Sequence, residues 1–154
     1  MAANTRRLET RRMVAAAAAL VALHVPAEAA RRRPFPGPVE ATVIEVIDGD
    51  TFLAEAHVWP GHSVTVNIRI RGIDAPEMKA RCSKEREAAL LARDELDALI
   101  TGASIRLSNI GGAKYYGRVL ADVATQDGLS VGPALLARAL VRPYSGGKRG
   151  GWCR

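Results

Sequence analysis

One segment of this chain alternates strictly between apolar and polar side chains, and this most limits how the chain can fold. One side of that segment, read as an extended strand, carries Val64, Val66, Ile68 and Ile70. The other side carries Thr65, Asn67, Arg69 and Arg71. A period of two predicts a β-strand over Ser63 to Ile73 with one buried face. The following Asp74-Ala75-Pro76-Glu77 ends it, because proline cannot donate to a strand ladder.

Similar patterns predict the remaining elements. We expect further strands over Val39 to Ile47, Thr51 to Trp59, Ser104 to Ile110 and Gly117 to Thr125. Helices are expected from Ser83, as the N-cap, to about Ile100, and over Leu129 to Leu140. The first helix has one apolar stripe, formed by Ala88, Ala89, Ala92, Leu96 and Leu99. This order predicts a mainly β fold with helices (α+β), a five-stranded OB-type Greek-key barrel with two packed helices.

Composition narrows the class of protein. The 154 residues are 48% hydrophobic and 25% charged, which predicts one globular domain and excludes wholesale disorder. Two cysteines are too few for a disulfide-framed scaffold, and three scattered histidines without a CxxC pair exclude the common structural zinc sites. No apolar run reaches the ~20 residues of a membrane span. The net charge of +6 favours a polyanionic partner.

The first 29 residues have the layout of a secretory signal peptide. Four arginines precede an apolar run over residues 13–25, Pro26 breaks it, and Ala27-Glu28-Ala29 is a cleavage site of small residues. The alternative is an Ala-rich helix of the domain, but the run has no polar face. We expect export to the periplasm or the medium, with cleavage after Ala29. Residues 30–38 then form a basic, Pro-rich arm, which is a solvated tether or an additional phosphate contact.

Ionisable residues gather in three short segments at the ends of predicted strands. These segments are Asp48-Gly49-Asp50-Thr51, Arg69 to Glu77, and Lys114 to Arg118. Each acid could be a turn or cap residue, and the acids and arginines could form a structural network. Buried networks of that kind are poor stabilisers, which weakens the structural explanation.

The ordered set D-G-D-T, R-x-x-x-x-D-x-P-E and Y-G-R resembles the thermonuclease family, the secreted nucleases related to staphylococcal nuclease. The resemblance covers roughly Val43 to Tyr144, within a domain over residues 39–144. It implies that Asp50, Asp74 and the backbone carbonyl of Ala75 bind one Ca²⁺. The family has threonine where this chain has Ala75, which keeps the carbonyl. Calcium takes six to eight oxygen ligands of this kind.

The resemblance also implies the catalytic residues. Glu77 contacts or activates the attacking water, either as the full general base or by orienting it. Arg69 and Arg118 bind the phosphate and stabilise the charge that develops on it. Arg71 has no role in the family pattern and could be a further phosphate contact.

Three residues of the loop before Arg118 are predicted to bind substrate. Tyr116 matches a tyrosine that touches the terminal phosphate in the family. Tyr115 replaces the family's lysine and could stack on a base, and Lys114 precedes it.

The chain departs from the family after Tyr144, where a Gly-rich, basic tail over residues 145–154 replaces the last long helix. Export would expose Cys82 and Cys153 to an oxidising compartment. We therefore expect a Cys82–Cys153 disulfide that fastens the tail, the alternative being two free thiols.

The resemblance implies a secreted, Ca²⁺-dependent nuclease that hydrolyses phosphodiester bonds of DNA or RNA with little base specificity. Water attacks phosphorus, the 5′-oxygen leaves, and the products carry 3′-phosphates. We expect a monomer with no stable membrane association. Two alternatives stay open, a non-catalytic exported OB-fold module that binds nucleic acid, and a secreted interaction module whose acids and arginines only pair with each other.

Overall fold

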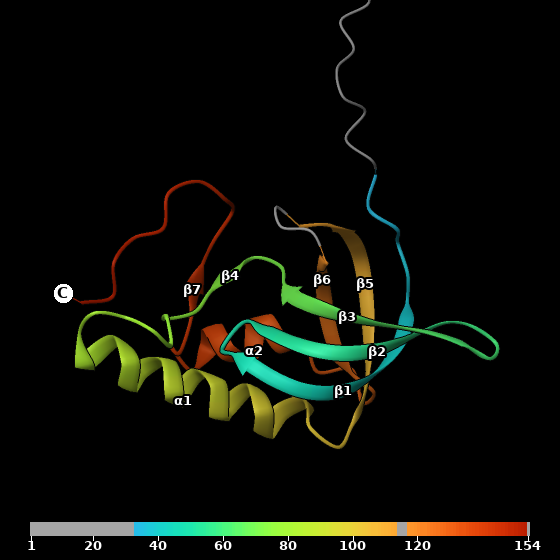
Figure 1. Ribbon diagram of the computed structural model, residues 1–154, viewed down its shortest axis with the longest axis horizontal. Helices are drawn as coiled ribbons and strands as arrows, with labels where there is room; N and C mark the ends of the chain where they lie inside the picture. The colour runs from blue at the N-terminus through green and yellow to red at the C-terminus, as the bar shows by residue number, and fades with distance from the viewer. Residues whose placement is uncertain (1–32, 114–116, 154) are drawn as a thin grey trace, which may run out of the picture. The chain divides into compact units, whose positions relative to one another are not determined.

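The computed structural model describes residues 33–113 and 117–153, and the predicted signal peptide and the loop residues Lys114, Tyr115 and Tyr116 lie outside that part. The elements in chain order are β1 (Val39–Asp48), β2 (Thr51–Trp59), β3 (His62–Ile70), β4 (Ile73–Asp74), α1 (Ser83–Ile100), β5 (Ser104–Gly112), β6 (Arg118–Thr125), α2 (Val131–Ala137) and β7 (Arg142–Pro143) (Figure 1).

Five of these strands close into a barrel in the order β1-β2-β3-β6-β5. All neighbours are antiparallel except β3 and β6, which run parallel. This confirms the predicted α+β fold with a five-stranded OB-type barrel and two helices. The two-residue strands β4 and β7 form a separate small sheet that the sequence did not predict.

Several boundaries differ from those predicted, for local reasons. β3 ends at Ile70 and not at Ile73, because Gly72 adopts a φ of 82° and turns the chain into β4. Helix α1 has the predicted extent, but its N-cap is Cys82 and Ser83 is already helical. Helix α2 is shorter than expected and begins only at Val131.

The core lies between the barrel interior and the two helices. Strand residues in it include Phe52, Ile68, Ile70, Ile105 and Leu107, and helical residues include Ala92, Leu96, Ile100, Val131 and Leu135. The apolar stripe predicted for α1 therefore faces the core. Helix α1 contacts β1 and α2, and α2 also contacts β6. No helix among the described residues is long and apolar enough to cross a lipid bilayer.

Both ends of the described chain are attached to this fold. In the arm, Phe35 pairs with Ile110 of β5 through two backbone hydrogen bonds of 2.7 Å. After β7, the C-terminal segment runs back toward the beginning of α1 (Figure 1). There Cys153 forms a disulfide with Cys82, with an S–S distance of 2.09 Å, as predicted. A disulfide is typical of a non-reducing compartment.

Candidate active site

Strand register brings the predicted catalytic residues to one rim of the barrel. Thr51 of β2 is the cross-strand partner of Arg69 of β3, so Asp50 lies beside the Arg69 guanidinium. The parallel pairing of β3 with β6 places Arg118 opposite Asn67, near Arg69. Arg69 and Arg118 line the same cavities, as their alignment on neighbouring strands requires.

Asp50 is a buried carboxylate with several donors around it. Its Oδ1 accepts from the Thr51 hydroxyl at 2.8 Å and from Nη1 of Arg69, and its Oδ2 accepts from the backbone N–H of Ala75 at 2.9 Å. Burial, joined by the Asp48 carboxylate, raises the pKa of Asp50 from 3.8 to about 6. Arg69, the Ala75 N–H and the Thr51 hydroxyl act in the opposite direction. Further positive charge beside Asp50 would therefore favour its ionised form.

Asp74 is fully buried and faces the same guanidinium. Nη2 of Arg69 lies 3.8 Å from Asp74 Oδ1, so both aspartates face one group and do not point apart. The β4–β7 pairing sets Asp74 opposite Arg142, which donates to Asp74 Oδ2 from Nε at 3.1 Å and from Nη2 at 2.9 Å. Asp74 Oδ1 is buried and lies against Nε of Arg149, with no hydrogen bond of regular geometry among the described residues.

Glu77 differs from the aspartates because its side chain is 56% exposed. It follows the buried Pro76 in the connection to α1. Its backbone N–H donates to Glu85 Oε1 at 3.2 Å, and Glu85 is a buried acid in the first turn of α1. Glu85 therefore fixes the backbone of Glu77, while the Glu77 carboxylate stays within reach of solvent.

Two cavities meet at this rim. The smaller, of about 240 Å³, is lined by polar groups that include Asp50, Ala75, Glu77, Arg69 and Arg118. The larger, of about 580 Å³, also has Arg69 and Arg118 in its wall, together with Tyr144 and Gly-rich segments. The same arginines thus line both cavities, whereas the acids Asp48, Asp50 and Glu77 line only the smaller one.

Two further arginines belong to the site and were missed in the sequence. Arg142 pairs with Asp74 as described, and Arg149 of the tail contacts Asp74, Glu77 and the Ala75 carbonyl. The only signal for them was the predicted disulfide, which brings the tail to the start of α1, close to Glu77.

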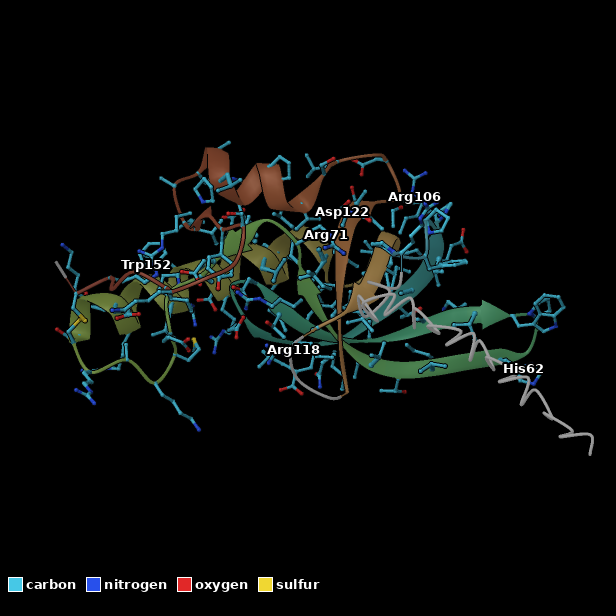
Figure 2. The ribbon with its side chains drawn as sticks, turned by 90° about the horizontal axis from the view of Figure 1, so that it is seen from above. His62, Arg71, Arg106, Arg118, Asp122 and Trp152 are labelled. Atoms are coloured by element: carbon cyan, nitrogen blue, oxygen red, sulfur yellow. A yellow bond between two sulfur atoms is a disulfide. The ribbon has the colours of Figure 1, made fainter. Side chains whose placement is uncertain are left out.

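Arg71 is not part of this cluster. It donates to the carbonyl of Leu120 at 3.0 Å and to that of Asn109, and its Nε lies 3.6 Å from Asp122. Figure 2 shows Arg71 and Asp122 together near α2, while Arg118 lies apart from them. The structure therefore gives no support for Arg71 as a phosphate contact beside Arg69. Lys114, Tyr115 and Tyr116 fall outside the described residues, so their predicted role in substrate binding stays a prediction.

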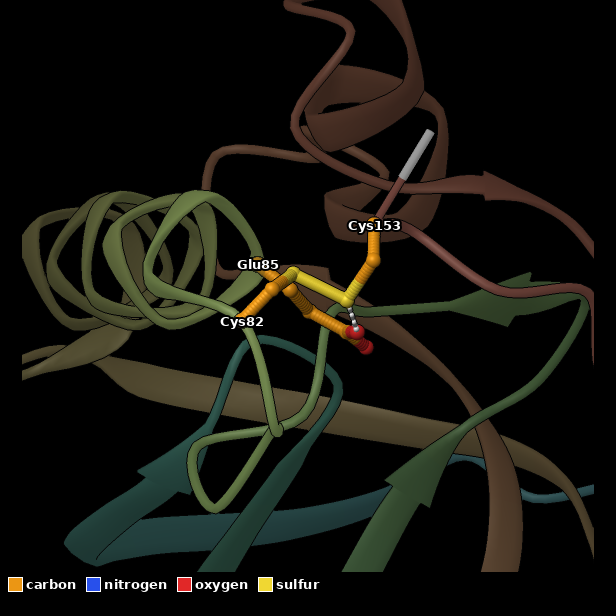
Figure 3. Close-up of side chains that lie close together, drawn as sticks. All are labelled: Cys82, Glu85 and Cys153. Carbon is orange, nitrogen blue, oxygen red and sulfur yellow. Dashed lines mark hydrogen bonds between the residues drawn. A yellow bond between two sulfur atoms is a disulfide. The ribbon is translucent and has the colours of Figure 1, made fainter.

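The disulfide lies directly behind the Glu77 loop. Sγ of Cys153 is 3.2 Å from Oε2 of Glu85, whose other oxygen accepts from the Glu77 backbone (Figure 3). A disulfide sulfur carries no hydrogen, so in the oxidised chain this is a contact and not a donated bond. Cys82, Glu85 and Cys153 also lie close enough together to hold a metal ion, but the disulfide leaves no thiolate for one.

The oxygen donors in and beside the smaller cavity are of the type that a hard divalent cation such as Ca²⁺ prefers. Asp50 and Ala75 line the cavity, and the buried Asp74 lies beside it, paired with the Arg69 guanidinium that also faces Asp50. Asp74 Oδ1 is buried and faces the guanidiniums of Arg69 and Arg149, so it is an anionic oxygen to which a divalent cation would bind in place of one of them.

No protein-family model matches this chain, and no curated protein matches it.

Proposed function

We propose that this chain is an exported, Ca²⁺-dependent phosphodiesterase that hydrolyses nucleic-acid backbones, as its resemblance to the thermonuclease family implies. One observation carries the proposal: two buried aspartates and a solvent-accessible glutamate share one rim with two arginines from neighbouring strands. The net charge of +6 favours a polyanionic substrate.

The cation would be held by Asp50, Asp74 and the Ala75 carbonyl, and when bound it supplies positive charge against the phosphate oxygens. Burial of the two aspartates supports this assignment. Buried carboxylates require opposite charge, which Arg69, Arg142 and Arg149 supply in this structure and which a divalent ion would supply when bound.

The side chains of the chain itself would perform the remaining steps. The Arg69 and Arg118 guanidiniums bind two phosphate oxygens and remain charged at every working pH. Glu77 accepts a proton from the water whose oxygen attacks phosphorus. The bond from phosphorus to the 5′-oxygen breaks, and that oxygen takes a proton from solvent. Because phosphates are the groups recognised, little base specificity is expected.

A non-catalytic nucleic-acid-binding barrel is the second candidate, and one observation favours it. The larger cavity is lined by Arg69, Arg118 and Arg149 and, among the described residues, by no acid. The pairing of Asp50, Asp74 and Glu77 with arginines is instead what a secreted interaction module would show. A binding module needs the arginines to contact phosphate but has no role for Glu77, an acid that is 56% exposed beside two buried aspartates. A hydrolase needs a proton acceptor that solvent can reach, and we therefore place the enzyme first.

The test is cleavage of a labelled single-stranded DNA by the purified, oxidised chain with Ca²⁺ and then with EGTA. We expect products only with Ca²⁺. Glu77→Gln should reduce turnover by about 10²–10⁴-fold and leave the Kd for DNA nearly unchanged, because the proton acceptor is lost while the arginines remain. Glu45→Gln removes an exposed acid of β1 outside the site and is the matched control.

Two outcomes would contradict this assignment. DNA binding without cleavage under both conditions supports the binding module. Cleavage by Glu77→Gln at the wild-type rate would show that Glu77 is not the proton acceptor.

A further inference from the structure

The guanidinium of Arg149 spans the oxygens that we assign to the cation. Its Nε lies against Asp74 Oδ1, its Nη1 against Glu77 Oε1, and its Nη2 donates to the Ala75 carbonyl at 2.7 Å. Two of these three groups, Asp74 and Ala75, are proposed cation ligands. A planar cation with a fork of donors therefore occupies the position where a divalent ion would need the same lone pairs.

The tail that carries Arg149 is held at both ends. At its far end, Cys153 is bonded to Cys82, and the ring of Trp152 lies under the Arg142 guanidinium with 4.4 Å to the ring centroid. Figure 2 shows Trp152 on this side of the molecule, well away from Arg71 and Arg106. At its near end, the Tyr144 hydroxyl donates to the Gly147 carbonyl at 2.7 Å.

Close packing around Arg142 fixes the path of the tail between these ends. Arg142 donates to the carbonyls of Gly150 and Gly151, and a Cβ added at Gly150 would lie 3.2 Å from Arg142 Nη1. Arg142 also donates to Asp74. It therefore links the backbone next to Arg149 to the carboxylate that Arg149 itself contacts.

We propose that Arg149 and the divalent cation exclude each other at Asp74 and Ala75, and that the Cys82–Cys153 disulfide keeps the guanidinium in place. The oxidised chain is then the form with low cation affinity, and release of the tail raises that affinity. This inference rests on the cation site of the proposed function. Arg149 also lines the larger cavity beside Arg69 and Arg118, which gives its side chain a place to move when a cation displaces it.

The expected change in the apparent Kd for the cation follows from the fraction of molecules in which Arg149 does not cover the cation site. If Arg149 covers the oxygens in about 90–99% of molecules, the apparent Kd for the cation is raised about 10–100-fold over that of the open site. Arg149 contacts Asp74, Glu77 and the Ala75 carbonyl at the same time, and charge-assisted contacts of this kind favour the covered state.

Reduction of the Cys82–Cys153 disulfide releases the tail without removing the charge of Arg149. A small dithiol donates two electrons and two protons, the Cys82–Cys153 bond breaks, two thiols form, and the dithiol is oxidised to its own disulfide. All charges of Arg149, Asp74 and Glu77 are unchanged by this step. Reduction also frees the Cys82 and Cys153 thiols beside Glu85, but Ca²⁺ prefers oxygen ligands to thiols. A higher Ca²⁺ affinity after reduction therefore reports the position of the tail and not a change in net charge.

The experiment measures Ca²⁺ binding by isothermal titration calorimetry, without substrate. The samples are the oxidised chain, the dithiol-reduced chain, oxidised Arg149→Ala and oxidised Lys148→Ala. We expect the reduced chain and Arg149→Ala to bind Ca²⁺ about 10–100-fold more tightly than the oxidised chain. Lys148→Ala removes the same charge one residue earlier and should change the Kd by less than about threefold, the effect of one exposed charge. Cys153→Ser replaces reduction if the dithiol interferes, and circular dichroism verifies that each sample is folded.

The outcomes distinguish this inference from the proposed function. Equal Ca²⁺ affinity in all four samples leaves the cation site intact and overturns the role of Arg149. An equal gain in Arg149→Ala and Lys148→Ala would mean that net charge alone acts, which also overturns it. Absence of Ca²⁺ binding in every folded sample refutes the cation site itself, and the inference falls with it.

Discussion

Removal of the Cys82–Cys153 bond tests how much the C-terminal segment contributes to the stability of the fold. The two cysteines are 71 positions apart in the sequence, so the bond closes a long loop. In the chain-entropy description, a cross-link of this span removes about 15 cal/mol/K from the unfolded ensemble, or about 4 kcal/mol at room temperature. That is a large share of the 5–15 kcal/mol by which native domains are typically stable.

The assay compares the oxidised chain with a Cys82→Ala, Cys153→Ala double variant in urea at neutral pH. We expect the free energy of unfolding of the variant to be lower by about 4 kcal/mol. Its m-value should be higher, because an unfolded chain without the cross-link exposes more surface. A thiol titration of the denatured, unreduced protein provides the control and should find no free thiol.

A difference below about 1 kcal/mol between the two proteins would refute the reasoning. It would mean that the tail and the Glu77 loop are held by their other contacts, such as those of Arg142, or that the unfolded chain stays compact around this loop.

Two other predictions concern the turn between β1 and β2. A Cβ added at Gly49 would lie 2.6 Å from the Cβ of Ala92, so Gly49→Ala should lower the free energy of unfolding by about 1–3 kcal/mol, as measured in urea. The control is Gly112→Ala, at a site with no described atom within 4 Å of the new Cβ, which should leave that free energy nearly unchanged. The second prediction concerns Asp50, whose pKa in the folded chain is raised to about 6. Between about pH 4 and 6 the folded chain therefore binds more protons at this group than the unfolded chain does. The contribution of Asp50 to the free energy of unfolding falls as the pH rises through that range. The free energy of unfolding of Asp50→Asn should therefore rise relative to that of the wild type between pH 4 and 6.5, because asparagine does not titrate. A difference between the two proteins that does not change with pH would contradict the raised pKa.

Much of the barrel could be predicted from the sequence because its signals are local. Alternation over β3 and the three- to four-residue spacing in α1 each predict one buried face. The predicted face of α1 packs into the core, and that of β3 does so from Val66 to Ile70, whereas Val64, near the β2–β3 turn, is 48% exposed. Boundaries failed where a single backbone conformation decided them. The positive φ of Gly72 ends β3 early and creates β4. Glycine permits such a turn but does not require it, so the sequence pattern alone does not decide where the strand ends.

The sequence by itself determined which strands and helix form and which acids and arginines stand at strand ends, because hydrophobic periodicity and turn chemistry act over a few residues. Only the tertiary structure decided the partners of those acids. The β4–β7 pairing sets Arg142 on Asp74, and the disulfide-bound tail sets Arg149 across Asp74 and Glu77. These contacts join residues about seventy positions apart. They depend on strand register and chain path, which arise from the packing of the whole domain and leave no pattern in a short stretch of sequence.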